Sequence, residues 1–249
     1  MWQRAATVSR RYPDFCLDDG YDRVMAKNLR PAHPLLLASI AGGLIYPLLW
    51  NTGLSDPALL VAKGCGVALL AVYAATVARS RDGWLLATVM AFGALGDVLL
   101  NIRFEVGALA FAIGHLVAIW LYLGNRQGPM TTARKWLVGV LPLAALLMPW
   151  LLLGTHDGLI GLAIYALLLT LMAVTAWISR FPTKLVGVGA MMFVISDGLI
   201  VARMGPLAGV FGTSLAVWLL YYIGQLLICV GVSRTLARYP GAARTAAVR

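Results

Sequence analysis

Long apolar segments alternate with short polar ones along the chain from residue 34 onwards. Eight segments of about 17–22 residues are almost entirely apolar, and about 20 residues are enough for an α-helix to cross the hydrocarbon core of a bilayer. They occupy residues 34–50, 57–78, 83–102, 107–123, 136–153, 158–178, 185–201 and 212–232. The pattern predicts an all-α fold, a polytopic membrane helix bundle with eight transmembrane helices.

The breaks between the apolar segments carry turn residues or charges, as at 51–53 (Asn-Thr-Gly) and 79–82 (Arg-Ser-Arg-Asp). The first segment matches a spanning helix least well, because it is short and contains Pro47. Residues 1–33 are polar and mixed in charge, without the apolar core of a signal peptide. We therefore expect three parts: a polar cytoplasmic N-terminal tail at 1–33, an eight-helix transmembrane domain at 34–232 and a basic cytoplasmic tail at 233–249.

The distribution of Lys and Arg predicts how the helices are oriented. Seventeen of the 20 basic residues lie in the two tails and in the loops at 79–82, 124–135 and 179–184. The alternate loops carry only Arg103 and Arg203. Because cytoplasmic loops are enriched in Lys and Arg, we expect both termini in the cytoplasm. An even number of crossings also places both termini on one side.

Composition removes most other classes of protein. Hydrophobic residues make up 61% of the chain and charged residues only 12%, about half of the roughly 25% found in soluble domains. The net charge of +10 therefore belongs to the membrane flanks and not to a nucleic-acid-binding surface. We expect a multi-pass protein of the cell (inner) membrane that contacts membrane lipids and no nucleic acid. Its oligomeric state is left open.

Several ionisable or polar side chains interrupt the apolar segments, where an uncompensated charge costs at least a few kcal/mol. Asp97 and Asp197 each lie about 8 Å from the non-cytoplasmic end of their helices. Lys63, Tyr165 and His115 lie at about 9, 10 and 12 Å on three further helices. Five helices thus bring polar groups to nearly one depth, which predicts a shared cavity in the outer half of the bilayer.

Tyr221 and Gln225 belong to the same set, because their i, i+4 spacing places both on one stripe of the last helix. Structural roles are the alternative for single members. Lys63 can pair with a carboxylate to join two helices, and His115 can be an interhelical hydrogen-bonding residue. Two carboxyl groups at one depth, together with these two residues, are harder to explain by packing alone.

No metal or cofactor is expected from the sequence. A His-rich zinc site needs about three His and a carboxylate. His33 is placed near the cytoplasmic face and His156 in an outer loop, so neither converges on His115. A metal held by Asp97, His115 and Asp197 is the one variant that the sequence leaves open.

The segments around these residues resemble the YhhN family of membrane lysoplasmalogenases. The resemblance rests on 96–100 (Gly-Asp-Val-Leu-Leu), on Phe104, Gly107, Phe111 and His115, on 193–197 (Phe-Val-Ile-Ser-Asp) and on 221–227 (Tyr-Tyr-Ile-Gly-Gln-Leu-Leu). Lys63 and Tyr165 fall where the family has a Lys and a Tyr. The resemblance covers roughly residues 35–232 and implies an eight-helix fold.

The resemblance also implies an activity: hydrolysis of the vinyl ether bond of lysoplasmalogens, with either a choline or an ethanolamine headgroup, to a fatty aldehyde and a glycerophospho-alcohol. Such chemistry needs one neutral carboxylic acid that protonates carbon and one carboxylate that takes a proton from water. Two carboxyl groups in a poorly solvated pocket favour one of each. We expect Asp97 and Asp197 to be catalytic, and the residues that bind the lysophospholipid to be Lys63, His115, Tyr165, Tyr221 and Gln225.

Other functions use similar residues. A proton-coupled transporter or a lipid-binding membrane protein can contain the same Asp, His and Lys cluster. A transporter, however, needs a polar path to the cytoplasmic side, where the sequence offers only Gln225 and Thr175. An intramembrane aspartyl protease also has two membrane Asp, but Asp97 does not follow Gly-x-Gly, and Asp197 follows Ser instead of Tyr.

Overall fold

The structure is a computed structural model that describes residues 33–128, 130–154 and 158–238. The predicted N-terminal tail at 1–33 and most of the predicted C-terminal tail therefore lie outside the described residues. All regular elements of the described residues are helices, and one isolated bridge joins Arg126 to Ser179. The prediction of an all-α fold is confirmed.

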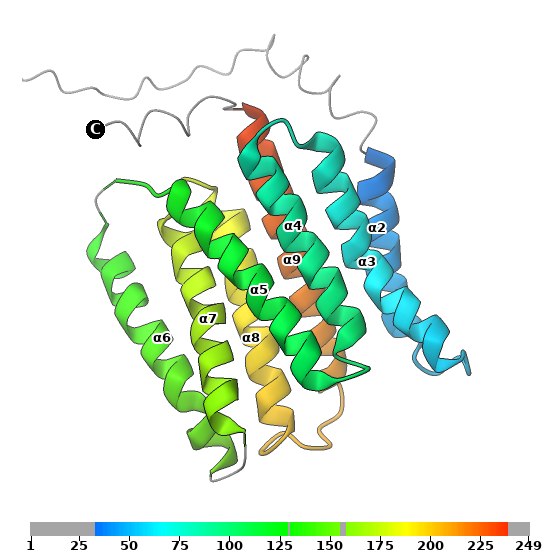
Figure 1. The fold of residues 1–249 in the computed structure, drawn as a ribbon. Helices are drawn as coiled ribbons and strands as arrows, with labels where there is room; N and C mark the ends of the chain where they lie inside the picture. The colour runs from blue at the N-terminus through cyan, green and yellow to red at the C-terminus, as the bar shows by residue number, and fades with distance from the viewer. Residues whose placement is uncertain (1–32, 129, 155–157, 239–249) are drawn as a thin grey trace, which may run out of the picture.

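The helices follow one another with short connections (Figure 1). They are α2 (His33–Ile45), the 3₁₀-helix η2 (Tyr46–Leu49), α3 (Asp56–Val77), α4 (Arg81–Leu99), α5 (Phe104–Gly124), α6 (Thr132–Leu153), α7 (Leu159–Ile178), the π-helix η3 (Thr183–Gly187), α8 (Val188–Arg203) and α9 (Thr213–Arg238).

Seven helices are long and apolar enough to cross a membrane: α3 to α7, η3 together with α8, and α9. The chain is thus an integral membrane protein with several crossings. The first apolar stretch, Pro34–Leu49, is shorter, because the α-helix gives way to η2 with Pro47 near its start. The eighth crossing and the cytoplasmic termini stay predictions.

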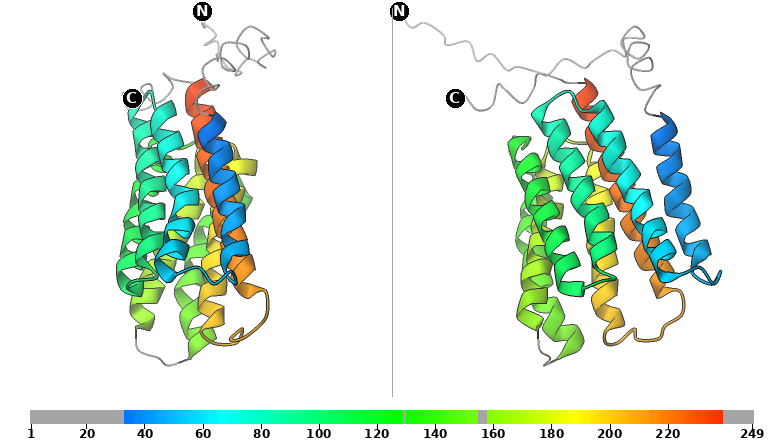
Figure 2. Two further views of the ribbon diagram at one scale, coloured as in Figure 1. Left: turned by 90° about the vertical axis from the view of Figure 1, so that its right-hand side faces the viewer. Right: turned by 45° about the vertical axis from the view of Figure 1, so that its right-hand side comes forward.

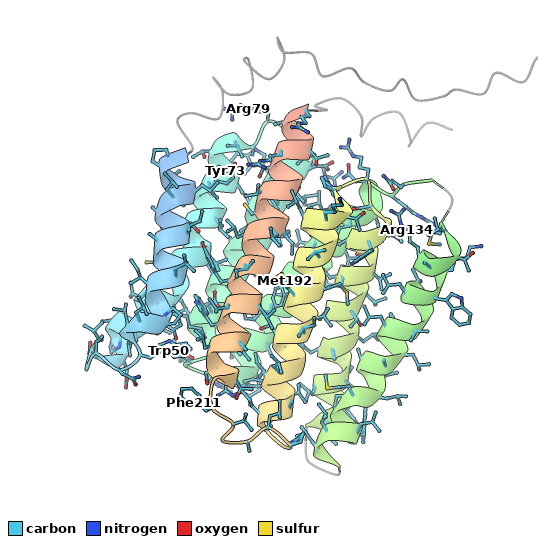
Figure 3. The ribbon with its side chains drawn as sticks, turned by 180° about the vertical axis from the view of Figure 1, so that it is seen from behind. Trp50, Tyr73, Arg79, Arg134, Met192 and Phe211 are labelled. Carbon is cyan, nitrogen blue, oxygen red and sulfur yellow. The ribbon has the colours of Figure 1, made fainter. Side chains whose placement is uncertain are left out.

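Successive helices run in opposite directions, with α2 at one edge of the bundle and α6 at the other (Figures 1 and 2), and α7 packs between α5 and α6. The last helix, α9, packs against α3, α4 and α8 and so joins the two halves of the bundle. Residues 33 and 238 lie at the same end, which we call the terminal end. The opposite end, where Trp50 and Phe211 are labelled in Figure 3, is called the far end.

Polar side chains hold three helix ends together at the terminal end. The Asn125 amide donates to the Asp82 carboxylate over 2.8 Å, and the Arg180 guanidinium donates to the Asn125 side-chain oxygen over 2.6 Å. Asp82 begins α4, Asn125 follows α5 and Arg180 follows α7. Asn125 is 3% exposed, so its amide satisfies partners from two directions and fixes the relative heights of these helices.

The backbones of α8 and α9 are in close contact. These two helices are connected by the last loop at the far end. An added Cβ at Gly224 would lie 2.7 Å from the Gly189 carbonyl oxygen, and the converse distance is also 2.7 Å. Small residues allow helices to approach closely in membranes, where packing replaces the hydrophobic effect as the driving force. These two glycines therefore fix the position of α8 against α9.

The last helix is longer than the sequence predicts. It continues to Arg238, past the expected end at 232. Ser233 and Thr235 are buried, and the Thr235 hydroxyl donates to the Gly231 carbonyl over 2.8 Å. The polar residues at this point are packed inside the bundle, and they do not end the helix.

Candidate active site

A cavity of about 1340 Å³ lies in the far half of the bundle and is lined by residues of α3 to α9 and η2. Most of its lining is apolar. Toward the terminal end, the lining reaches Ala112 on α5, Thr170 on α7 and Tyr221 on α9. The cavity therefore occupies the part of the bundle where the sequence predicts the polar residues to gather.

The Asp97 carboxylate is held between α4 and α9. Asp97 is 2% exposed and lines the cavity. Its Oδ2 accepts a hydrogen bond of 2.8 Å from the Tyr221 hydroxyl. Gly93 lies one turn before Asp97, and its missing side chain leaves room for that hydroxyl and for the Gln225 amide. Gln225 also contacts the Tyr221 hydroxyl. Helix α9 therefore supplies both the tyrosine that binds the carboxylate and the amide that binds the tyrosine.

The Asp197 carboxylate has a parallel arrangement between α8 and α7. Its Oδ2 accepts a hydrogen bond of 2.6 Å from the Tyr165 hydroxyl. The same hydroxyl lies 3.4 Å from His115 Nε2 on α5. The neighbouring Ser196 hydroxyl donates to the Val217 carbonyl over 2.9 Å, which ties this turn of α8 to α9.

The two carboxyl groups share one environment. Both line the large cavity. Lys63 on α3 lines the same cavity. Its ammonium group lies 3.5 Å from the Asn101 side-chain oxygen. Two acids and one cation thus lie together in a mostly apolar cavity, where charge interactions are strong because water is scarce.

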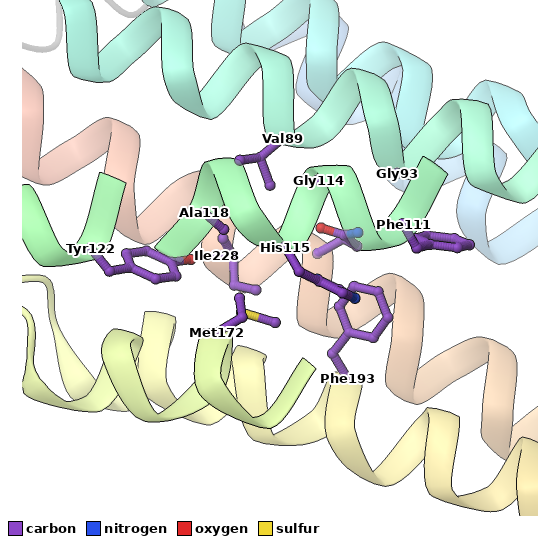
Figure 4. Close-up of a pocket in the computed structure, with 11 residues that line it drawn as sticks. Val89, Gly93, Phe111, Gly114, His115, Ala118, Tyr122, Met172, Phe193 and Ile228 are labelled. Carbon is purple, nitrogen blue, oxygen red and sulfur yellow. The ribbon is translucent and has the colours of Figure 1, made fainter. Parts of the chain in front are cut away.

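His115 and Gln225 lie behind this cavity, not on its wall. They line an adjoining void of about 10 Å³ (Figure 4), which is roughly the space that one water molecule needs. Figure 4 shows the His115 ring beside Phe193, with ring centroids 5.1 Å apart. The ring centroids of Phe111 and Phe193 are 5.9 Å apart, so aromatic rings surround His115 on this side. The two polar residues therefore reach the carboxylates through Tyr165 and Tyr221.

The predicted residues are thus grouped as follows. The large cavity is lined by Lys63, Asp97, Tyr165, Asp197 and Tyr221. The adjoining void is lined by His115 and Gln225. In the part of the chain that the structure describes, no three His, Cys, Asp or Glu side chains are placed to share a metal ion.

Sequence reasoning missed several residues of the cavity wall. Tyr46 comes from η2, Trp50 directly follows it, Trp218 comes from α9, and Glu105 and Arg203 come from helix ends at the far end. Aromatic and charged residues near the ends of apolar segments are common at membrane interfaces, so their positions carried no distinguishing signal. Only Pro47, near the start of η2, pointed to irregular structure there.

Comparisons with known proteins identify the family of this chain. Two curated relatives, a protein of Mycobacterium bovis and one of Mycobacterium tuberculosis, are both named lysoplasmalogenase. Each is 28% identical to this chain over 179 residues, and the match covers 68% of this chain and 68% of the relative. No solved structure matches the chain. Among protein-family models, that of the YhhN family matches residues 58–232, a segment that contains both carboxyl groups and all of their polar partners. The chain therefore belongs to the YhhN family.

Proposed function

We propose that this protein is a membrane-embedded hydrolase that cleaves the vinyl ether bond of lysoplasmalogens. The family and the printed names of its two relatives support the substrate class. The observation that carries the proposal is the pair of carboxyl groups, Asp97 and Asp197, on the wall of one cavity of about 1340 Å³. A mostly apolar cavity of this size has room for a long hydrocarbon chain, with acid–base groups placed beside it.

The chemistry of the bond explains why two acids are needed. A neutral carboxylic acid protonates the β-carbon of the vinyl ether, and the resulting cation is stabilised as an oxocarbenium ion. Water then adds to this ion and loses a proton to the second carboxylate. The hemiacetal collapses to a fatty aldehyde and a glycerophospho-alcohol, and the proton balance of the two acids is restored. One water molecule is consumed in each turnover.

Tyr165 and Tyr221 prepare the two acids for these roles. Each hydroxyl donates a hydrogen bond to one carboxylate, over 2.6 Å for Tyr165 and 2.8 Å for Tyr221. Such bonds fix the rotamer of each carboxyl group and leave its second oxygen without a bond to the tyrosine. The two acids interact, so they titrate as a pair, and we assign the role of proton donor to the pair and not to one residue.

The remaining polar residues take supporting roles in this proposal. Lys63 lies on the cavity wall and supplies a positive charge for the phosphate of the lysolipid. His115 and Gln225 touch the tyrosine hydroxyls from behind, and we assign them to positioning instead of direct substrate contact. We place the protein in the cell (inner) membrane, with both termini cytoplasmic and the cavity toward the outer leaflet.

A transporter is less consistent with the cavity. A transport path has to reach both faces of the membrane, whereas the lining residues stop near Ala112, Thr170 and Tyr221, about midway along their helices. A purely lipid-binding protein would need no paired acids. It is distinguished from the hydrolase by turnover alone.

The direct test uses purified protein in detergent and three lysolipids with the same chain and headgroup. One carries an alkenyl ether, one an alkyl ether and one an acyl ester. We expect fatty aldehyde from the alkenyl lipid and no product from the other two, because only the vinyl ether forms an oxocarbenium ion on protonation. Release of fatty acid from the ester, or no aldehyde from the alkenyl lipid, would contradict the proposal.

A further inference from the structure

Three aromatic rings form one corner of the large cavity at the far end of the bundle. Tyr46 and Trp50 come from the turn at η2, and Trp218 comes from α9. The ring centroids of Tyr46 and Trp50 are 5.7 Å apart, and those of Tyr46 and Trp218 are 4.5 Å apart. We call these three residues the aromatic corner. Figure 3 shows Trp50 at the far end, opposite the terminal end.

The aromatic corner is held in place and is close to the acids. The Trp218 indole N–H donates to the Gly43 carbonyl over 2.7 Å, which fixes its ring. The ring centroid of Trp218 lies 5.8 Å from that of Tyr221, the tyrosine that donates a hydrogen bond to Asp97. Helix α3, which carries Lys63, packs against η2. The corner therefore adjoins the tyrosine that holds Asp97 and the helix that carries Lys63.

The opposite part of the cavity has a different chemistry. There α6 and α7 contribute Met148, Leu153, Leu162 and Leu168, which offer hydrocarbon and no polar side-chain group. Asp97 is hydrogen-bonded to Tyr221, which lies beside the aromatic corner, and Asp197 is hydrogen-bonded to Tyr165 on α7, the helix that supplies part of the apolar lining. A molecule with a long chain at one end and a charged group at the other therefore has one favourable orientation, with its chain against α6 and α7.

We propose that the aromatic corner and Lys63 together bind a phosphocholine headgroup, which makes choline lysolipids the preferred substrate class of this enzyme. This inference rests on the proposed function. Lys63 neutralises the phosphate, and the aromatic faces bind the quaternary ammonium group. Aromatic faces attract cations through the negative charge of their π-systems, most strongly where water is excluded.

The aromatic corner favours choline over ethanolamine for a physical reason. A quaternary ammonium group has no N–H, so it loses no hydrogen bonds when aromatic rings replace water. A primary ammonium group has three donors that aromatic faces leave largely unsatisfied. Glu105 is the rival partner, since it is the one Glu on the cavity wall among the described residues, and a carboxylate would bind the primary ammonium group well.

The test compares alkenyl lysolipids with choline and ethanolamine headgroups on the wild type and on Trp50→Leu and Trp50→Phe. We expect the wild type to have the lower KM for choline, and Trp50→Leu to raise that KM by about 2- to 30-fold with kcat largely unchanged. The ethanolamine KM changes little. Trp50→Phe retains most of the preference because it keeps an aromatic face. Trp136→Leu is the matched control, since Trp136 is an exposed Trp on α6, outside the cavity lining.

Binding of non-hydrolysable alkyl-ether lysolipids to the same variants separates this inference from the proposed function. Tighter binding of the choline lipid that is lost in Trp50→Leu supports the headgroup site even if no aldehyde is formed. Aldehyde release without headgroup preference, or with equal losses for both headgroups in Trp50→Leu, overturns the inference and leaves the hydrolase intact. A choline preference that disappears in Glu105→Gln and persists in Trp50→Leu also overturns it.

Discussion

At the scale of single residues, two tyrosine hydroxyls determine how the acids are presented. Tyr165 and Tyr221 come from different helices, yet each donates to Oδ2 of one Asp. A phenol can donate only one hydrogen bond, so each hydroxyl is committed to its carboxylate while His115 or Gln225 contacts it from behind. The site is therefore built from two similar halves.

Replacing either tyrosine with Phe should lower turnover without unfolding the protein. Tyr165→Phe and Tyr221→Phe each remove one hydrogen bond to a carboxyl group, worth about 1–3 kcal/mol, which corresponds to about 5- to 100-fold in kcat. Steady-state aldehyde release measures the effect. Tyr73→Phe is the matched control, because Tyr73 is also buried but lies at the terminal end (Figure 3). Equal kcat in all three variants would remove the tyrosines from the mechanism.

The two acids and their polar partners can be singled out from the sequence, but which partner pairs with which acid cannot. Asp97 and Asp197 stand out because a charge inside an apolar segment needs an explanation. The pairing of Tyr165 with Asp197 depends on the rotation of two helices about their own axes, which the spacing within one helix does not determine. Tyr46 and Trp50 were missed for a different reason: aromatic residues near the ends of apolar segments are common at membrane interfaces, so their positions gave no distinguishing signal.

At the scale of elements, the contact between α8 and α9 controls the geometry of the site. Helix α8 carries Asp197, and α9 carries Tyr221, the donor to Asp97. The helices approach so closely at Gly189 and Gly224 that a Cβ on either would meet a backbone oxygen. Any change that separates these helices therefore moves a part of both halves of the site.

Gly224→Ala should destabilise the protein and reduce its activity together. The added methyl group would lie 2.7 Å from the Gly189 carbonyl oxygen, and overpacking of this kind costs about 1–3 kcal/mol. Thermal unfolding in detergent and aldehyde release report the two effects. Gly139→Ala on α6 is the control, since an added Cβ there meets nothing within 4 Å. A stable and fully active Gly224→Ala variant would show that the helices separate without consequence.

The helices themselves were largely predictable, because apolar segments of spanning length identify them directly. The residues at which the helices begin and end were less predictable. The first segment becomes α2 followed by η2, and the last helix continues to Arg238 because Ser233 and Thr235 are buried. Hydropathy alone does not distinguish a polar residue that ends a helix from one that packs against a neighbour.

At the scale of the whole molecule, orientation in the membrane decides which leaflet supplies the substrate. Among the described residues, most Lys and Arg lie at the terminal end, in and beside the loops at 79–82, 124–135 and 179–184. The far end, where the cavity lies, carries few of them. From the positive-inside rule we therefore predict that the cavity faces the outer leaflet.

Cysteine labelling in intact cells tests this orientation. In a background without the three native cysteines, Thr52→Cys at the far end should react with a membrane-impermeant maleimide. Gln127→Cys, between α5 and α6 at the terminal end, should react only after the cells are permeabilised. Both side chains are exposed. The reverse labelling pattern would show that the cavity faces the cytoplasmic leaflet.

The most direct measurement of the central claim is aldehyde release from an alkenyl lysolipid by Asp97→Asn and Asp197→Asn. Each replacement preserves shape but removes an acid–base group, so turnover should fall by about 10²- to 10⁴-fold in either variant. Asp82→Asn, which changes a carboxylate at the terminal end outside the cavity, should retain turnover. Near-normal turnover in Asp97→Asn or in Asp197→Asn would contradict a mechanism that depends on both acids.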